Sequence, residues 1–244
     1  YFDTAWGYHG GNSEVVVGEI LKKYPRDSYY IANKFPGYDL SNMDKVEEIF
    51  EEQLAKMGVE YFDFYLLHCV DEESWPNIPA LNMFDILKKE MEAGRIRHLG
   101  ASFHCSAEFL DKVLSTYGDY IEFVQLQINY IDWENPSVQA KKCYEIATKY
   151  NKPVIVMEPV KGGTLVNLPP EAVDIMKETH PELSVQSWAI RFSASLENVM
   201  VVLSGMSNYE QVDDNTSYME NFQPYTEKDY ETLGKVLDIF NQAA

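Results

Sequence analysis

Four side chains capable of proton chemistry stand near the start of the chain: Asp3, Tyr8, Lys34 and His68. A tyrosine has an unperturbed pKa of about 10, too high for efficient proton transfer near neutrality. A nearby lysine ammonium stabilises the phenolate and lowers that pKa, and an aspartate paired with the lysine keeps it charged and in place. An imidazole beside them can donate a hydrogen bond to a carbonyl oxygen. The four groups therefore predict a general acid for carbonyl reduction that lacks only a source of hydride.

Each of these residues has an ordinary explanation when it is taken alone. An aspartate at a strand end often caps a helix or forms a turn. A lone histidine is more often a core residue than a catalyst, and a lysine is more often a surface residue. The set is informative because Asp3, Lys34 and His68 each close a strand-like run and Tyr8 follows the first run. Consecutive strands then deliver all four groups to one end of a sheet.

Runs rich in β-branched and aromatic residues alternate with amphipathic, charged segments. The strand-like runs cover residues 1–5, 29–35, 62–68, 96–102, 123–129, 153–159 and 198–205. Apolar residues recur at helical spacing in 44–57, 106–115 and 230–240, with Ser106 as an expected N-cap and Ser41 as a possible start of a capping box. Alternation of this kind predicts βαβ units and a parallel sheet.

The seven predicted strands favour a specific α/β architecture. A (β/α)8 TIM barrel needs eight strands, and 244 residues suit one such domain. We therefore expect a single domain over residues 1–244, a barrel lacking its first βα unit. The competing architecture is a doubly wound open sheet. It would normally carry a G-x-G-x-x-G turn after a strand, which this sequence lacks.

Composition narrows the classes of partner. The chain has 20 Lys plus Arg against 39 Asp plus Glu, a formal net charge of -19, which argues against nucleic-acid and membrane partners. The apolar runs are far shorter than a membrane span. Cys69, Cys105 and Cys143 form no C-x-x-C pair, which favours a reducing, cytoplasmic location.

Seven short motifs, each at or near the end of a predicted strand, occur in a fixed order along the chain. They are DTA-x-x-Y at 3–8, SE at 13–14, NKF at 33–35, YLLH at 65–68, IRHLGAS at 96–102, Q-x-x-Y at 127–130 and SGMSNYEQVDDN at 204–215. In these motifs the chain resembles the aldo-keto reductase family from that family's second strand onward. The resemblance implies an NAD(P)H-dependent enzyme that reduces a small aldehyde or ketone and reversibly oxidises an alcohol. It also implies that Asp3, Tyr8, Lys34 and His68 are the catalytic tetrad, with Tyr8 as the general acid.

The same resemblance assigns residues to a nicotinamide cofactor, NADP by family habit with NAD not excluded. Ser102 and Gln127 match positions that hold the carboxamide, and Met157 stands where many members stack an aromatic ring on the nicotinamide. The implied contacts to the adenine end are Gly205, Ser207, Gln211 and Asn215. No Lys or Arg lies between Gly205 and Glu220, although an adenosine 2′-phosphate normally needs a basic partner, so Lys161 or Arg191 could serve instead.

The nearest branch of that family often continues into a cysteine-rich, ferredoxin-like [4Fe–4S] segment. That segment is absent from this sequence, and the three cysteines lack the spacing of such a cluster, so we expect no iron–sulfur or other metal site in this chain. One alternative function is a nucleotide-binding regulatory or redox-sensing module without significant turnover. Another is an inactive, incomplete barrel with exposed strand edges. The sequence indicates neither the substrate nor the oligomeric state.

Overall fold

The computed structural model describes residues 1–243 and divides into two compact units by its internal contacts. Unit 1 contains Tyr1–Leu126 and Lys142–Val154, and unit 2 contains Gln127–Lys141 together with the chain from Ile155 onward. This division does not test the expected single domain, which stays a prediction.

The sheet of unit 1 is parallel, and its strands follow one another in chain order. These strands are β1 (Phe2–Asp3), β2 (Ile31–Phe35), β3 (Phe62–Val70), β4 (Ile96–Phe103) and β5 (Phe123–Gln127, in unit 1 up to Leu126). All five residues of β2 are buried, as expected for a strand covered on both faces. In the register, Asp3 pairs with Ala32, and Lys34 pairs with Leu66. The ends of neighbouring strands, where the candidate residues lie, therefore meet at one edge of the sheet.

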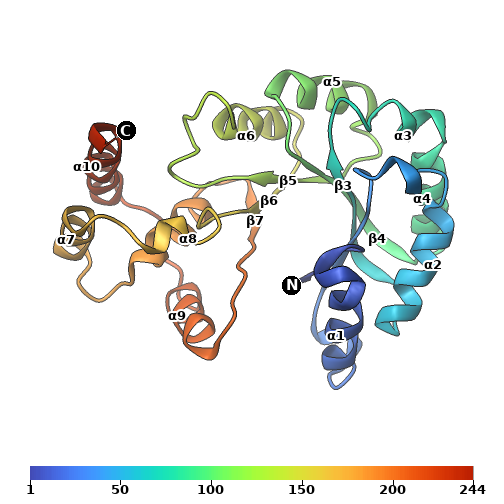
Figure 1. The fold of residues 1–244 in the computed structure, drawn as a ribbon, viewed down its shortest axis with the longest axis horizontal. Helices are drawn as coiled ribbons and strands as arrows, with labels where there is room; N and C mark the ends of the chain where they lie inside the picture. The colour runs from blue at the N-terminus through green and yellow to red at the C-terminus, as the bar shows by residue number, and fades with distance from the viewer. Residues whose placement is uncertain (244) are drawn as a thin grey trace. The chain divides into compact units, whose positions relative to one another are not determined.

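Helices cover the outer face of this sheet. They are α1 (Asn12–Leu21), α2 (Val46–Met57), α3 (Asn77–Ala80), α4 (Met83–Glu92), α5 (Ala107–Tyr117) and α6 (Ala140–Lys149), the last beginning in unit 2. Figure 1 shows α2 and α4 together beside β3 and β4. α1 approaches α2 so closely that a Cβ on Gly18 would lie 2.5 Å from the carbonyl oxygen of Met57. Only glycine permits that approach between the two helices.

Two expected helix starts had different outcomes. Ser106 caps α5 as predicted, because its side-chain oxygen accepts a hydrogen bond from the N–H of Phe109. The capping box from Ser41 was wrong. Ser41 lies in a 3₁₀ turn and donates its hydroxyl to Asp39, which itself caps that turn, and α2 begins only at Val46.

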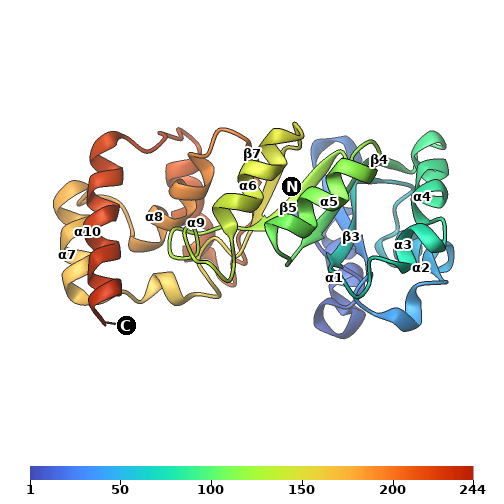
Figure 2. The same cartoon turned by 90° about the horizontal axis from the view of Figure 1, so that it is seen from above.

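As far as residue 243, unit 2 contains two short strands and four α-helices. The elements are β6 (Val154–Met157, in unit 2 from Ile155), α7 (Pro170–Thr179), α8 (Val185–Ala194), β7 (Val199–Val202), α9 (Tyr209–Met219) and α10 (Glu227–Ala243). Helices α7 and α10 lie side by side (Figures 1 and 2). All seven predicted strands are thus present in residues 1–243.

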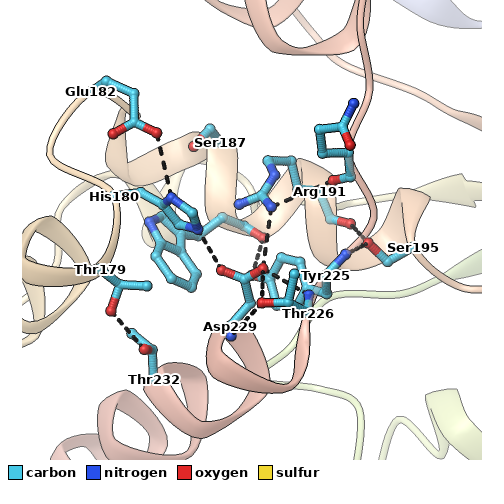
Figure 3. Close-up of polar contacts among 12 residues, drawn as sticks. Thr179, His180, Glu182, Ser187, Arg191, Ser195, Tyr225, Thr226, Asp229 and Thr232 are labelled. Atoms are coloured by element: carbon cyan, nitrogen blue, oxygen red, sulfur yellow. Dashed lines mark hydrogen bonds and ion pairs between the residues drawn. The ribbon is translucent and has the colours of Figure 1, made fainter.

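A buried charge cluster joins the end of α7 to the start of α10 (Figure 3). His180 Nε2 lies 2.6 Å from Oδ1 of Asp229, and Arg191 Nη2 lies 3.5 Å from Oδ2. Thr226 donates both its N–H and its hydroxyl to the same Oδ2, at 2.8 and 2.9 Å. Burial alone would raise the pKa of Asp229, but the hydrogen bonds from Thr226 and His180 and the charge of Arg191 hold it below its usual range.

Candidate active site

Unit 1 brings Lys34 and Asp3 into direct contact across β2 and β1. Lys34 Nζ donates to Oδ2 of Asp3 at 2.7 Å and to the carbonyl oxygen of Thr4 at 2.8 Å. The lysine side chain has no exposed surface, whereas that of Asp3 is 16% exposed. A buried ammonium is strongly unfavourable unless it is paired, so this contact explains why both residues stand at adjacent strand ends.

Tyr8 lies next to this ion pair. It begins a 3₁₀ turn, Tyr8–Gly11, in which His9 adopts a left-handed backbone with φ of 52°. The Tyr8 ring centroid is 4.8 Å from Lys34 Nζ and 5.6 Å from the His68 ring centroid, in an edge-to-face arrangement. Tyr8 is 37% exposed, so the phenol is accessible while the lysine beneath it is not.

Burial sets the electrostatics of the ion pair. It raises the pKa of the Asp3 carboxyl and lowers that of the Lys34 ammonium, while their mutual attraction opposes both shifts. Each charge is therefore held mainly by the other, and the ammonium next to Tyr8 depends on Asp3.

His68 is neutral at physiological pH. Burial, reinforced by the charges of Lys34 and His104, lowers its pKa to about 3. Its Nδ1 is buried and has no hydrogen-bond partner in the part of the chain that the structure describes. The sequence pattern predicted that His68 ends its strand, and this was wrong, because β3 continues to Val70. The register of β3 with β4 shifts between Leu67 and Val70. The irregularity falls at Cys69, where φ is 52°.

A buried amide network, not foreseen from the sequence, holds the backbone around Lys34. Asn33 donates to Oε1 of Glu14 at 2.9 Å, and its own side-chain oxygen accepts from the N–H of Lys34 at 2.9 Å. Gln53 donates to the carbonyl oxygen of Lys34 at 2.8 Å and accepts from the hydroxyl of Tyr65 at 2.6 Å. Such polar residues in otherwise apolar segments are the only sequence signal of this network.

Ser102 is linked by a hydrogen bond to the backbone of Cys69, the residue that follows His68. Its Oγ accepts a hydrogen bond from the N–H of Cys69 at 2.8 Å, and the residue is almost fully buried. A hydroxyl that accepts one bond still has its own proton to donate. Ser102 can therefore act as a donor to a bound polar group.

In unit 2, Gln127 and Met157 stand at the ends of β5 and β6. The N–H of Ile128 donates to the carbonyl oxygen of Met157 at 3.2 Å, which links the two ends. Gln127 Nε2 donates to Oδ2 of Asp132 at 2.9 Å. Asp132 is a buried neighbour that no sequence motif pointed to.

The residues predicted to contact the adenine end of the cofactor lie in unit 2, in α9 and in the segment just before it. Gln211 and Asn215 lie one turn apart on α9, as their spacing predicts. The N–H of Ser207 donates to Oε1 of Gln211 at 2.6 Å, and Asn215 Nδ2 donates to Oγ of Ser204 at 2.8 Å. Gly205 has open space where a Cβ would be. These residues form a polar segment without a Lys or Arg between Gly205 and Glu220.

The two basic residues suggested as substitutes are both engaged elsewhere. Arg191 is buried against Asp229, and its Nη2 donates to the carbonyl oxygen of Gln223 at 3.4 Å (Figure 3). Lys161 forms an ion pair with Asp132. Neither contact offers support for a 2′-phosphate.

Two further observations concern residues 1–243 as a whole. No group of three or more His, Cys, Asp or Glu side chains is arranged to hold a metal ion, and all three cysteines are free. None of the helices described is both long and apolar enough to cross a membrane.

Strand–helix alternation around an Asp–Tyr–Lys–His group indicates an α/β oxidoreductase of the barrel type. The model of the aldo/keto reductase family matches residues 1–238, and the chain belongs to that family. It is therefore an oxidoreductase of the NAD(P)-dependent aldo-keto reductase type, as the sequence motifs predicted.

Known proteins similar to this chain include two named for a reductase and a dehydrogenase activity. An NADH-specific methylglyoxal reductase of Escherichia coli is 24% identical over 88% of this chain and 77% of its own length. An L-galactose dehydrogenase of Arabidopsis thaliana is 27% identical over 97% of this chain and 78% of its own length.

Solved structures confirm the fold class. An aldo-keto reductase of Klebsiella pneumoniae in complex with NADPH superimposes with a TM-score of 0.77 at 19% identity, covering 96% of this chain and 78% of the other. The holo form of an aldo-keto reductase from Bacillus halodurans gives 0.73 at 22% identity, covering 97% and 81%. At these identities the likeness shows the fold, and the α/β barrel class is the one predicted.

Proposed function

We propose that this protein reduces a small aldehyde or ketone with hydride from NADH or NADPH, and oxidises the corresponding alcohol in reverse. The observation that carries the proposal is the buried Lys34–Asp3 pair, whose ammonium lies 4.8 Å from the ring centroid of an accessible tyrosine. That arrangement is suited to a general acid, because a cation stabilises the phenolate left after proton transfer.

The roles of the four side chains follow from their charge states. Tyr8 donates its phenolic proton to the substrate oxygen, and Lys34 stabilises the phenolate that remains. Asp3 keeps Lys34 charged. His68, neutral because burial lowers its pKa to about 3, orients the substrate by donating a hydrogen bond to the same oxygen. The bound nicotinamide supplies the hydride.

The donors and acceptors of the chain fit a nicotinamide nucleotide. A carboxamide needs one donor and one acceptor, which Ser102 and Gln127 can supply. Met157 offers a polarisable thioether that can cover a ring face. Gly205, Ser207, Gln211 and Asn215 are the proposed contacts to the adenine end.

The substrate class is a small, uncharged or weakly charged carbonyl compound. A net charge of -19 disfavours anionic substrates by long-range repulsion. The names of the two relatives suggest methylglyoxal and a sugar-type substrate for a first panel. We also propose that the protein is located in the cytoplasm and that residues 1–244 form a single domain.

The test is the loss of reduced-nicotinamide absorbance with a panel of aldehydes, ketones and quinones, run with both NADH and NADPH. We expect turnover with at least one carbonyl class. Tight nucleotide binding without turnover on any member of the panel would instead support a regulatory module and sink the proposal of an enzyme.

A further inference from the structure

Asp132 is a buried carboxylate that the proposed mechanism does not use. Its side chain has no exposed surface. Oδ2 accepts hydrogen bonds from Gln127 Nε2 at 2.9 Å and from Asn129 Nδ2 at 2.8 Å, and Oδ1 pairs with Lys161. The N–H of Asp132 donates back to the side-chain oxygen of Asn129 at 2.9 Å. Each carboxylate oxygen therefore has a partner, and one of these partners is the proposed carboxamide contact.

The contact with Asp132 determines which way the amide of Gln127 faces. An ionised carboxylate can only accept hydrogen bonds, whereas a glutamine amide has a donating end and an accepting end. The Nε2 end of Gln127 must therefore face Asp132. The accepting end, Oε1, is then the one that Gln127 can present to a ligand.

Lys161 keeps Asp132 in the ionised form. Burial alone would raise the pKa of Asp132, but hydrogen bonds from Lys161, Asn129 and Gln127 hold it below its usual range. Lys161 is presented by a strained turn in which it and Glu158 have φ of 50° and 57°, and Asn129 Nδ2 donates to the carbonyl oxygen of Glu158 at 3.1 Å. Strain of this kind persists only where the surroundings hold it.

We propose that Asp132 is a positioning residue for the cofactor: it fixes the amide of Gln127 so that Oε1 accepts a hydrogen bond from the carboxamide NH₂ of nicotinamide. This inference rests on the proposed function, because it takes Gln127 as the carboxamide contact. It goes further by assigning the direction of that hydrogen bond and the residues that set it.

The test uses the 3-acetylpyridine analogue of NADH, in which a methyl group replaces the carboxamide NH₂. The analogue cannot donate to Gln127. We expect the wild-type protein to bind NADH about two- to tenfold more tightly than the analogue, the range for loss of one hydrogen bond. Binding is measured by fluorescence titration, together with the Kd of ADP-ribose, which lacks nicotinamide.

The variant Asp132→Asn removes the constraint at constant size. Its side-chain amide can either accept from Gln127 or donate to it, so both orientations of Gln127 become possible. We expect the preference for NADH over the analogue to fall to about onefold, the value expected without a directed bond. The Kd of ADP-ribose should not change. Gln127→Met should abolish the preference in the same way, and Asp174→Asn, an exposed aspartate on α7, should leave it intact.

Preserved discrimination in Asp132→Asn, with a normal Kd for ADP-ribose, overturns the proposal, as does preserved discrimination in Gln127→Met. If the single variant is too unstable for titration, Asp132→Asn with Lys161→Met removes both charges and is judged by the same ratio. A wild-type protein that turns over NADH without preferring it to the analogue refutes this inference alone. Failure to bind either NADH or ADP-ribose refutes the proposed function as well.

Discussion

Lys34 Nζ lies 2.7 Å from Oδ2 of Asp3, and the lysine side chain has no exposed surface. Neither charge is favourable in this position without the other, because the desolvation free energy of a single buried ion is large compared with the net stability of a protein domain. The pair also explains how an ammonium group can lie buried beside the phenol of Tyr8. Chemistry and stability at this site therefore depend on the same contact.

Replacing Tyr8 by Phe should abolish carbonyl reduction while sparing cofactor binding. The phenol supplies the proton, and loss of a general acid typically costs about 10²–10⁴ in rate. The measurement is kcat by absorbance together with the Kd of NADH by fluorescence. Tyr24→Phe, at an exposed tyrosine in the same unit, serves as the matched control. An unchanged kcat in Tyr8→Phe would refute the assignment of Tyr8 as the acid.

Asp3→Asn should destabilise the protein by about 3 kcal/mol near neutral pH, the usual cost of removing one partner of a buried ion pair. The deficit should shrink as pH rises. Lys34 without its partner has a folded-state pKa well below its unfolded value of about 10.4, so the unfolded state binds more protons and stability climbs with pH in that window. Urea unfolding at about pH 7 and about pH 10 checks this. A deficit that grows with pH would contradict it.

His68 should make stability fall in acid. Its folded-state pKa is about 3, below an unfolded value of about 6.5. Its contribution is therefore complete above about pH 6.5 and is lost as pH falls toward 3, at up to about 1.4 kcal/mol per pH unit. Melting temperatures between these limits should fall less steeply for His68→Asn than for the wild type. His9→Asn, at an exposed histidine, should keep the wild-type slope.

Much of the fold follows from sequence periodicity, since each predicted strand is a short apolar run bounded by polar residues. The meeting of Asp3 with Lys34 also follows, because parallel strands bring equivalent ends together. The amide network around Asn33 and the carboxylate of Asp132 could not be predicted. Their roles depend on which side chains from distant segments meet in the core, and spacing within one segment carries no information about that.

Arg191 is a residue for which the sequence suggested a binding role that its contacts in the structure do not support. Its position in the sequence made it a candidate for binding the cofactor, but its side chain is buried against Asp229. The guanidinium Cζ lies 5.2 Å from the centroid of the Tyr225 ring. A sequence shows that an arginine is present without showing which carboxylate it pairs with. Tertiary contacts therefore decide between a structural and a binding role.

Asp229→Ala should destabilise unit 2 by about 3 kcal/mol, because it leaves the buried Arg191 without its carboxylate and removes the acceptor for the N–H and hydroxyl of Thr226 at the start of α10. Asp238→Ala, at an exposed aspartate on the same helix, should be nearly neutral. The urea midpoints of the two variants provide the comparison (Figure 3 shows the contacts that are lost). Equal midpoints would show that the cluster contributes little to stability.

Gln211→Arg should shift cofactor choice toward NADPH. The polar segment at the start of α9 has no Lys or Arg between Gly205 and Glu220, but it carries Glu210, Asp213 and Asp214, which repel an added phosphate. An arginine at this position adds a planar donor that matches phosphate oxygens, and hydrogen bonds to charged groups are worth about 1.5–3 kcal/mol, or roughly tenfold and more in affinity. The Kd values of NADH and NADPH, measured for both proteins by fluorescence, give the ratio directly. Gln242→Arg on α10 adds the same charge away from this segment and should leave the ratio unchanged. If Gln211→Arg also leaves it unchanged, the 2′-phosphate lies elsewhere and the assignment of Gln211 to the adenine end is wrong.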